Sequence, residues 1–354
     1  MLNSKVVYVD FTPGGHHTEY LYHLIKETSV FDFIGSRKLW CSAFERSGKV
    51  TWDGSLKLYD CGIKEGFDYV VRYLEDFPGT VAFILHWDEY RLHHYKLLVY
   101  SRRVADRIGG IVFRSEVVRK RFSRVGLLDS LLLGILLQDN RVGFASLDWR
   151  LLDRYERMHW LPDPVGIERK LETSTIEKCQ LLLIGKQTKR KNGLWALQAL
   201  DESGFRGLIY VCGIIPSEFI EDYDRYSKKL NIRIWNKHLS DEEFVSKIMG
   251  ADVVCVPYLN WFGSSGIVVN SAFLGKKILA TEEGLIGDDV KRHKLGLTFQ
   301  KGNKLDFTKK LSSLLDEFSL NSFNQSSYLS KRTSKYFTST IYNIICRSRK
   351  TVVL

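Results

Sequence analysis

Two loops in the second half of the chain combine the residue types that bind phosphate groups. The first follows the apolar run Val253–Val256 and reads Gly263-Ser264-Ser265-Gly266, immediately before apolar residues at helical spacing. Free backbone N–H groups and the dipole at a helix N-terminus favour an anion, and these small residues let a phosphate approach the backbone. An ordinary helix start with serine at the N-cap accounts for the same residues.

The second loop is basic. It begins where the apolar run Cys179–Ile184 ends, and it carries Lys186 and Lys191 within the sequence GKQTKRKNG. Side chains at the carboxyl end of a buried parallel strand lie where such sheets bind their ligands. We therefore interpret the two lysines as phosphate ligands, with a solvated run of charge as the alternative.

Histidines occupy similar places in the first half. The sequence Gly14-Gly15-His16-His17 follows the strand-like run Lys5–Asp10 and opens an amphipathic segment, and His86 follows the run Thr80–Leu85. A glycine-rich turn between strand and helix is typical of a nucleotide or substrate loop, although two glycines alone are a weak signal. His86 is a candidate site residue, with a core or capping histidine as the alternative. The pair His93-His94, further into the next helix, is expected on the surface.

Apolar runs and amphipathic segments alternate along the whole chain, which predicts an α/β protein with doubly wound parallel sheets. A polar stretch, Gly166–Lys178, separates two series of such units and is the expected linker and hinge. The predicted domains are 1–166 and 167–333, with 334–354 as a C-terminal helix that crosses back to the first domain.

The composition is that of a soluble globular protein. Of the 354 residues 44% are hydrophobic and 26% are charged, and the formal net charge of +11 indicates an anionic partner. The six cysteines lack metal-ligand spacing, and several stand in apolar runs, as buried free thiols do in a reducing compartment. We recognise no signal peptide and no apolar run of transmembrane length.

The segment 117–137 is unusual because a basic stretch, VVRKRFSR, precedes a nearly uninterrupted apolar one. It is too short and too interrupted by Asp129 to span a bilayer. A basic and apolar helix suits the surface of an anionic membrane, whereas a buried helix with a basic flank is the alternative.

From Leu181 to about Phe299 the chain resembles the C-terminal domain of the GT-B glycosyltransferases, specifically the large retaining group called family 4. The resemblance lies in the order of four segments: LLLIGKQTKRKNG, LIYVCG, SDEEFVSKIMGADVVCVPY and GSSGIVVNSAFLGKKILAT. It implies two Rossmann-like domains that face a central cleft.

The resemblance also implies roles for individual residues. His86, Lys186 and Lys191 are the implied catalytic residues. The implied donor diphosphate ligands are Gly15, Lys186, Lys191, Gly263, Ser264, Ser265 and Gly266; the nucleoside ligands are Gly213, His238, Leu239 and Asn270; and the acceptor ligands are Gly14, His16, His17 and Arg114. No metal is expected, and no cofactor beyond the nucleotide-sugar substrate in its UDP or GDP form.

The sequence departs from the family at the paired glutamates. The matching positions are Phe262 and Asn270, so both acids are missing. Arg114 also stands where the family often has a histidine. Asn270 retains an acceptor for a ribose hydroxyl, and the chain is interpreted as a divergent active member.

The implied activity is that of a hexosyltransferase acting on a hydroxyl of a glycan or a polyprenyl-linked acceptor, with retention and without metal. Bacterial surface polysaccharide biosynthesis in the cytoplasm, or on the inner face of the plasma membrane through 117–137, is the expected setting. Two alternatives are a nucleotide-sugar epimerase of the same fold and a non-catalytic protein that binds nucleotides or nucleic acid. An epimerase needs acidic residues that are missing here, and no nucleic-acid-binding motif is recognised, so nucleic acid is not an expected partner.

Overall fold

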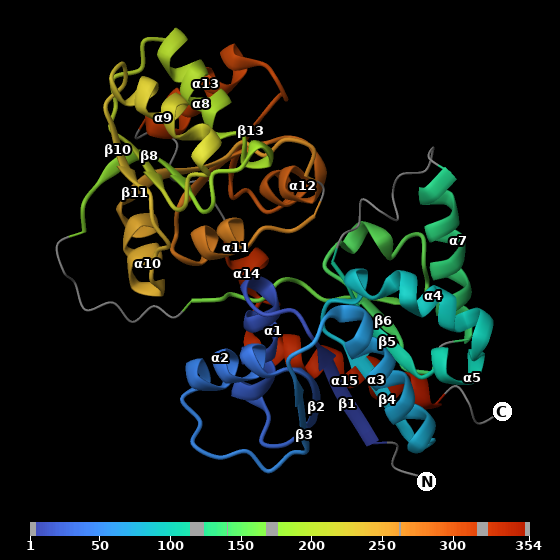
Figure 1. Cartoon of the computed structure of the whole chain (residues 1–354). Helices are drawn as coiled ribbons and strands as arrows, with labels where there is room; N and C mark the ends of the chain where they lie inside the picture. Colours follow the sequence, from blue (N-terminus) through green and yellow to red (C-terminus); the bar gives the residue numbers. More distant parts are fainter. Residues whose placement is uncertain are drawn as a thin grey trace. The chain divides into compact units, whose positions relative to one another are not determined.

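The computed structural model describes residues 5–113, 124–139, 141–167, 176–261, 263–316 and 325–350. These form two compact units (Figure 1), one made of 1–164 together with 331–354 and the other of 165–330. The sequence analysis had placed the boundaries after residues 166 and 333, within a few positions of these.

The first unit is built on a parallel sheet of seven strands in the order β3-β2-β1-β4-β5-β6-β7. The strands are β1 (Lys5–Asp10), β2 (Asp32–Ser36), β3 (Leu56–Tyr59), β4 (Thr80–Ile84), β5 (Ile108–Val112), β6 (Phe144–Ser146) and β7 (Met158–Trp160). The helices are α1 (Gly15–Glu27), α2 (Arg37–Ser47), α3 (Ile63–Asp76), α4 (Arg91–Tyr100), α5 (Arg102–Ala105), α7 (Arg124–Asp139) and α15 (Ser334–Lys350), with 3-10 turns η1 (Trp87–Glu89) and η2 (Trp149–Leu151).

The second unit repeats this plan with six parallel strands in the order β10-β9-β8-β11-β12-β13. The strands are β8 (Cys179–Ile184), β9 (Ile209–Cys212), β10 (Ile232–Trp235), β11 (Ala251–Val256), β12 (Lys277–Thr281) and β13 (Gly296–Phe299). The helices are α8 (Gly193–Glu202), α9 (Ile220–Ser227), α10 (Asp241–Gly250), α11 (Gly266–Phe273), α12 (Gly284–Arg292), α13 (Lys304–Leu315) and α14 (Ser326–Leu329), with 3-10 turns η3 (Lys189–Lys191) and η4 (Ser217–Phe219).

The predicted α/β class with doubly wound parallel sheets is therefore confirmed. In each sheet the strand order reverses at one place, between β1 and β4 and between β8 and β11. Open parallel sheets bind ligands outside the carboxyl ends of the strands at such a switch point. The loops that leave these four strands are accordingly the first places to look for function.

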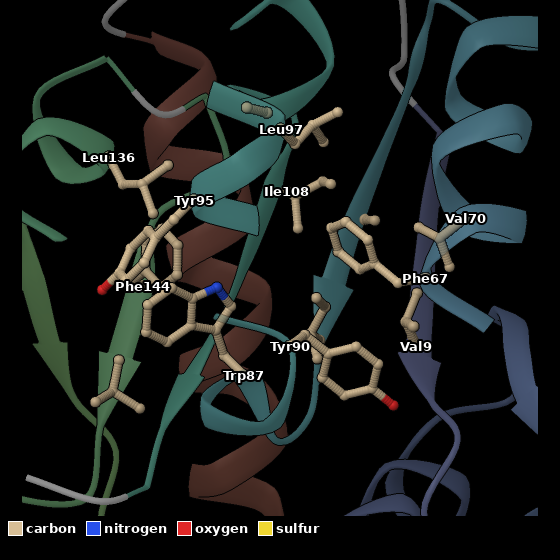
Figure 2. Packing of buried hydrophobic residues seen from close by; sticks show 14 of the residues in the cluster. Val9, Phe67, Val70, Trp87, Tyr90, Tyr95, Leu97, Ile108, Leu136 and Phe144 are labelled. Carbon is tan, nitrogen blue, oxygen red and sulfur yellow. The ribbon is translucent and has the colours of Figure 1, made fainter. Parts of the chain in front are cut away.

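The core of the first unit holds the loop after β4 in place. In Figure 2, Trp87 lies beside Tyr95 and Phe144. Tyr90 lies on the other side of Trp87, towards Val9 and Phe67. Both side chains are almost fully buried, and the Tyr90 hydroxyl oxygen accepts a hydrogen bond of 2.7 Å from the backbone N–H of Phe11. The segment between them is thus anchored at both ends.

The prediction that His94 lies on the surface is wrong. Its side chain is fully buried, and its Nδ1 accepts a 3.0 Å hydrogen bond from the indole N–H of Trp87. Its Nε2 lies 2.9 Å from the carbonyl oxygen of Ala105, to which it donates. Burial lowers the pKa of His94 to about 4, and the bond to Ala105 only partly offsets this effect. The sequence did not reveal this burial because α4 is only weakly amphipathic.

Helix α7 contains the described part of the segment 117–137. It buries Leu133 and Leu136 in the core but leaves Leu127, Leu128 and Leu131 more than half exposed. The basic residues before Arg124 lie outside the described residues, so the membrane contact stays a prediction. Among the described helices, none has both the length and the apolar character that crossing a membrane requires.

The C-terminal helix α15 belongs to the first unit, where it packs beside α1 (Figure 1). Phe337 is fully buried, and its ring centroid lies 5.1 Å from that of Tyr20. The preceding Arg332 donates a 3.0 Å hydrogen bond to the carbonyl oxygen of Asp163, whose carboxylate accepts one of 2.8 Å from Tyr20. These contacts tie the last described segment of the chain to the first helix.

Candidate active site

The loop after β8 is shaped around the side chain of Lys191. Gly185 directly follows β8 and has a φ of +96°, and a Cβ at this position would lie 2.8 Å from the Lys191 ammonium nitrogen. Only glycine combines this backbone conformation with such a close approach. Lys191 is half-buried and donates a 2.8 Å hydrogen bond to the hydroxyl of Tyr258. Its ammonium group is therefore held at the carboxyl end of the strand.

Tyr258 joins this loop to the one that follows β11. Its hydroxyl lies 3.4 Å from the hydroxyl oxygen of Ser265, and its backbone carbonyl accepts a 3.1 Å hydrogen bond from Thr281. The Arg190 guanidinium lies over the rings of Trp261, at 4.2 Å, and Tyr258, at 5.3 Å. The basic loop and the Gly/Ser loop thus meet through aromatic residues that the sequence analysis had not selected.

The Gly/Ser loop ends at the N-terminus of α11. Ser264 and Ser265 are buried, and Ser265 is the N-cap without a side-chain hydrogen bond to the helix backbone. The first N–H groups of α11 therefore receive no bond from the capping hydroxyl, and the helix dipole places partial positive charge there. Together with the Lys191 ammonium group near Ser265, this end of the sheet has the properties of an anion site.

The residues expected to bind the nucleoside have different positions. Gly213 has a φ of +118°, and a Cβ there would lie 2.5 Å from the carbonyl oxygen of Gly185, so it allows the ends of β8 and β9 to approach. Asn270 is buried, and its side-chain oxygen accepts a 3.1 Å hydrogen bond from the backbone N–H of Gly166. His238 is exposed, whereas Leu239 packs against the core. Lys186 is also exposed.

The switch point of the first unit gathers acids and histidines. Asp10, the last residue of β1, is fully buried and hydrogen-bonded at 2.8 Å to Nδ1 of His17. Gly14 and Gly15 precede His17 with φ values of +96° and +54°, which turn the chain from β1 into α1. The Thr12 hydroxyl in this turn donates a 2.6 Å hydrogen bond to the carboxylate of Glu89.

Glu89 faces both buried histidines. One of its carboxylate oxygens lies 3.7 Å from Nε2 of His17 and 4.0 Å from Nδ1 of His86. The rings of His17 and His86 are 4.4 Å apart, and the ring of Phe113 lies 4.8 Å from His86. His86 and Glu89 are three positions apart in sequence, and the short 3-10 turn η1 brings their side chains close to each other.

Electrostatic coupling in this cluster is strong. Burial alone would lower the pKa of His17, but its pairing with Asp10 and Glu89 outweighs burial and raises the pKa to about 9. Pairing with His17 lowers the pKa of Glu89 to about 2, whereas burial raises the pKa of Asp10 despite the bond to His17. At neutral pH His17 is therefore a cation that pairs with the carboxylate of Glu89 and with Asp10.

The structure brings together some of the predicted residues and separates others. His17 and His86 meet in one cluster, and Lys191 meets Ser265 through Tyr258. The ring of His16 lies 5.0 Å from that of Phe113, whose other ring neighbour is His86 at 4.8 Å. Arg114, predicted to bind the acceptor, and Phe262 lie outside the described residues.

Asp10, Glu89 and Tyr258 are site residues that the sequence analysis missed. Asp10 and Glu89 follow the same pattern as His86, because each is a polar residue at or just after the end of a buried strand. Tyr258 gave no such signal, because a tyrosine after an apolar run has the composition of an ordinary core residue.

Comparison with solved structures identifies the fold. HepE of Anabaena, solved in complex with UDP-glucose, superimposes with a TM-score of 0.68 at 10% identity over 97% of this chain and 99% of that one. WaaG, a glycosyltransferase involved in lipopolysaccharide biosynthesis, gives a TM-score of 0.58 at 12% identity over 98% and 99% of the two chains. An α,α-trehalose-phosphate synthase of Burkholderia xenovorans gives 0.62 at 10% identity over 98% and 100%.

The GT-B fold predicted from the sequence is thus confirmed over nearly the whole chain. No protein-family model matches the sequence, and no curated protein matches it either. The assignment to family 4 stays a prediction.

Proposed function

We propose that this protein is a glycosyltransferase that moves a sugar from a nucleotide-diphosphate sugar to a hydroxyl group of a glycan or a lipid-linked acceptor. The observation that carries the proposal is the position of the Lys191 ammonium group, which lies over Gly185 and is hydrogen-bonded to Tyr258 next to the N-terminal loop of α11. A diphosphate is the ligand that such a combination of cation, hydroxyl groups and helix N-terminus suits.

The chemistry assigned to this site is stabilisation of a leaving group. As the bond between the anomeric carbon and the diphosphate breaks, negative charge grows on the phosphate oxygens. Fixed cations and backbone N–H groups that are already in place stabilise this charge in the transition state. Lys191, Lys186 and the loop Gly263–Gly266 supply these groups, so the proposal requires no metal ion at the diphosphate.

The first unit is assigned to the acceptor and to orientation of the sugar. His17 is protonated at neutral pH and is therefore suited to donate hydrogen bonds rather than to remove a proton. We assign His17 and His86 to binding, and we assign deprotonation of the acceptor hydroxyl to the leaving diphosphate, as in front-face transfer with retention. A hexose donor in its UDP or GDP form and a role in surface polysaccharide synthesis at the cytoplasmic membrane complete the proposal. HepE, which was solved with UDP-glucose, supports the UDP form of the donor, and WaaG, which is involved in lipopolysaccharide biosynthesis, supports the polysaccharide role.

A ligand screen tests the donor site. The melting temperature of the pure protein is measured with UDP, GDP, ADP and their common sugars, for the wild type, Lys191→Ala and Lys189→Ala. Lys189 is an exposed lysine of the same loop and is the matched control. A nucleotide present at about a hundred times its dissociation constant adds roughly 2.7 kcal/mol of stability. The shift should persist in Lys189→Ala and disappear in Lys191→Ala.

The same screen can overturn the proposal. If no nucleotide stabilises the wild type, or if Lys191→Ala retains the full shift, the site does not bind a diphosphate as described. Turnover separates transfer from the alternatives. Free nucleoside diphosphate that appears only with an acceptor excludes an epimerase and a non-catalytic protein.

A further inference from the structure

We infer that His17, His86 and Glu89 form a binding site for a divalent transition-metal ion at the switch point of the first unit. One potential ligand atom of each residue lies within 4.8 Å of those of the other two. The inference goes beyond the proposed function: it gives His17 and His86, which that proposal assigns to binding of the acceptor and the sugar, the role of metal ligands. It does not depend on the diphosphate site, because other residues in the second unit form that site. It also departs from the expectation, drawn from the sequence, that the protein needs no metal.

The distances between the ligand atoms favour an ion over direct hydrogen bonds. Glu89 lies 3.7 Å from Nε2 of His17 and 4.0 Å from Nδ1 of His86. Both separations exceed the roughly 3.2 Å limit of an N–H···O hydrogen bond. Ligands bound tetrahedrally at about 2.0–2.1 Å from a metal lie about 3.3 Å from one another. Small side-chain movements therefore convert the observed cluster into a coordination sphere.

The groups behind the ligands are those that metal sites use for orientation. Asp10 is bonded at 2.8 Å to Nδ1 of His17, which directs the lone pair of Nε2 towards Glu89. Thr12 donates to the other carboxylate oxygen of Glu89 at 2.6 Å and leaves the facing oxygen available. A carboxylate–histidine–metal arrangement of this kind fixes the tautomer and increases the basicity of the ligand.

The ligand set indicates both the class of metal and the kind of site. Two imidazoles and one carboxylate suit zinc, iron(II), cobalt or manganese rather than calcium or magnesium. Three protein ligands leave a coordination position for water or for an oxygen atom of a bound molecule, as in metal sites that act on substrates. The side chain of Glu89 is 22% exposed, so an ion can enter from solvent on this side, while His17 and His86 are 10% and 6% exposed.

A cobalt titration tests the inference without any measurement of activity. The full-length protein is freed of metal with a chelator and titrated with Co²⁺, and the visible absorbance of the bound ion is recorded. The variants are His86→Ala and Glu89→Gln, and the control is His93→Ala, which removes a histidine of the following helix that contributes no ligand. Glu89→Gln preserves the shape of a partly exposed side chain, so it tests the inference even if His86→Ala does not fold.

We expect one Co²⁺ per chain in the wild type and in His93→Ala, and loss of the absorbance in Glu89→Gln and His86→Ala. Asp10→Asn, which alters only the residue that orients His17, should weaken binding by about 10- to 100-fold. Binding of Zn²⁺ should displace the cobalt signal. Absence of Co²⁺ binding by the wild type, or equal binding by Glu89→Gln, would overturn the inference.

Discussion

Replacement of Gly185 by alanine tests the proposed donor site, because its effect on nucleotide binding can be distinguished from its effect on folding stability. The new Cβ would lie 2.8 Å from the Lys191 ammonium nitrogen, and 3.2 Å from the side chain of Ile267. The end of a lysine side chain is free to move, so the clash does not prevent folding. It does push Lys191 away from Tyr258, to which it is hydrogen-bonded at 2.8 Å. We expect Gly185→Ala to fold and to bind the donor nucleotide weakly.

The size of the two effects follows from the geometry. An L-residue at the φ of +96° found for Gly185 costs about 1–2 kcal/mol of stability. A hydrogen bond from a charged group contributes about 1.5–3 kcal/mol. Loss of the contact between Lys191 and a phosphate should therefore weaken nucleotide binding roughly tenfold to a hundredfold.

Gly204→Ala is the matched control for the backbone strain. Gly204 belongs to the same unit and has a φ of +70°, but a Cβ there would meet nothing within 4 Å. Both variants should lose similar stability in urea unfolding. Calorimetric titration with the nucleotide identified by the ligand screen should show weakened binding in Gly185→Ala alone. If the two variants bind that nucleotide equally well, Lys191 does not contact the diphosphate from this position.

Two further predictions concern the first unit. The pKa of His94 is about 4 in the folded protein, whereas an unfolded histidine has a pKa of about 6.5. The unfolded state therefore binds the proton first, and stability falls as the pH drops from above 6.5 towards 4. Between pH 7.5 and 4.5 the loss from this residue is about 2.5 kcal/mol. Urea unfolding at several pH values should show a smaller decrease for His94→Gln than for the wild type, and equal decreases would contradict the assignment. Phe337→Ala should cost about 3–5 kcal/mol because this ring is fully buried. Tyr342→Ala, on the exposed side of the same helix, should have little effect, and similar losses in both variants would contradict the packing of α15 against α1.

Most of the fold could be predicted because buried parallel strands are continuous apolar runs. β1 and β8 have the bounds that the sequence predicted. The start of α10 was also readable from local residues, since Ser240 and Glu243 form a capping box with hydrogen bonds of 3.1 and 3.0 Å. Burial on a helix was harder. α4 packs His94 inward through polar bonds to Trp87 and Ala105, and hydrophobicity patterns do not register a polar residue in a core.

The sequence could predict individual site residues within one loop, but it could not predict which loops contact each other. Lys191 and Ser265 were found in separate loops, but their connection through Tyr258 depends on the adjacency of β8 and β11, which the sequence does not state. Likewise, His17 and His86 belong to loops brought together because β1 and β4 are neighbours. For Asn270 the sequence predicted a role but not the local partner. Its side-chain oxygen was expected to accept a hydrogen bond from a ribose hydroxyl, whereas in the structure it accepts one from the backbone N–H of Gly166.

The two switch points have the same topology and opposite electrostatic character, and this difference predicts different ligands for them. Lys191 and Arg190 lie at the second, where their positive charge and the N-terminus of α11, which has no side-chain cap, favour a diphosphate. Asp10 and Glu89 lie at the first, where a diphosphate would meet two carboxylates, and a cation would satisfy them. The net charge of +11 is therefore not spread evenly over the two switch points. Acidic residues lie at the switch point of the first unit, and basic residues lie at that of the second. We therefore expect the nucleotide to bind mainly to the second unit, and we expect an ion or a hydroxyl-bearing ligand at the acids and histidines of the first.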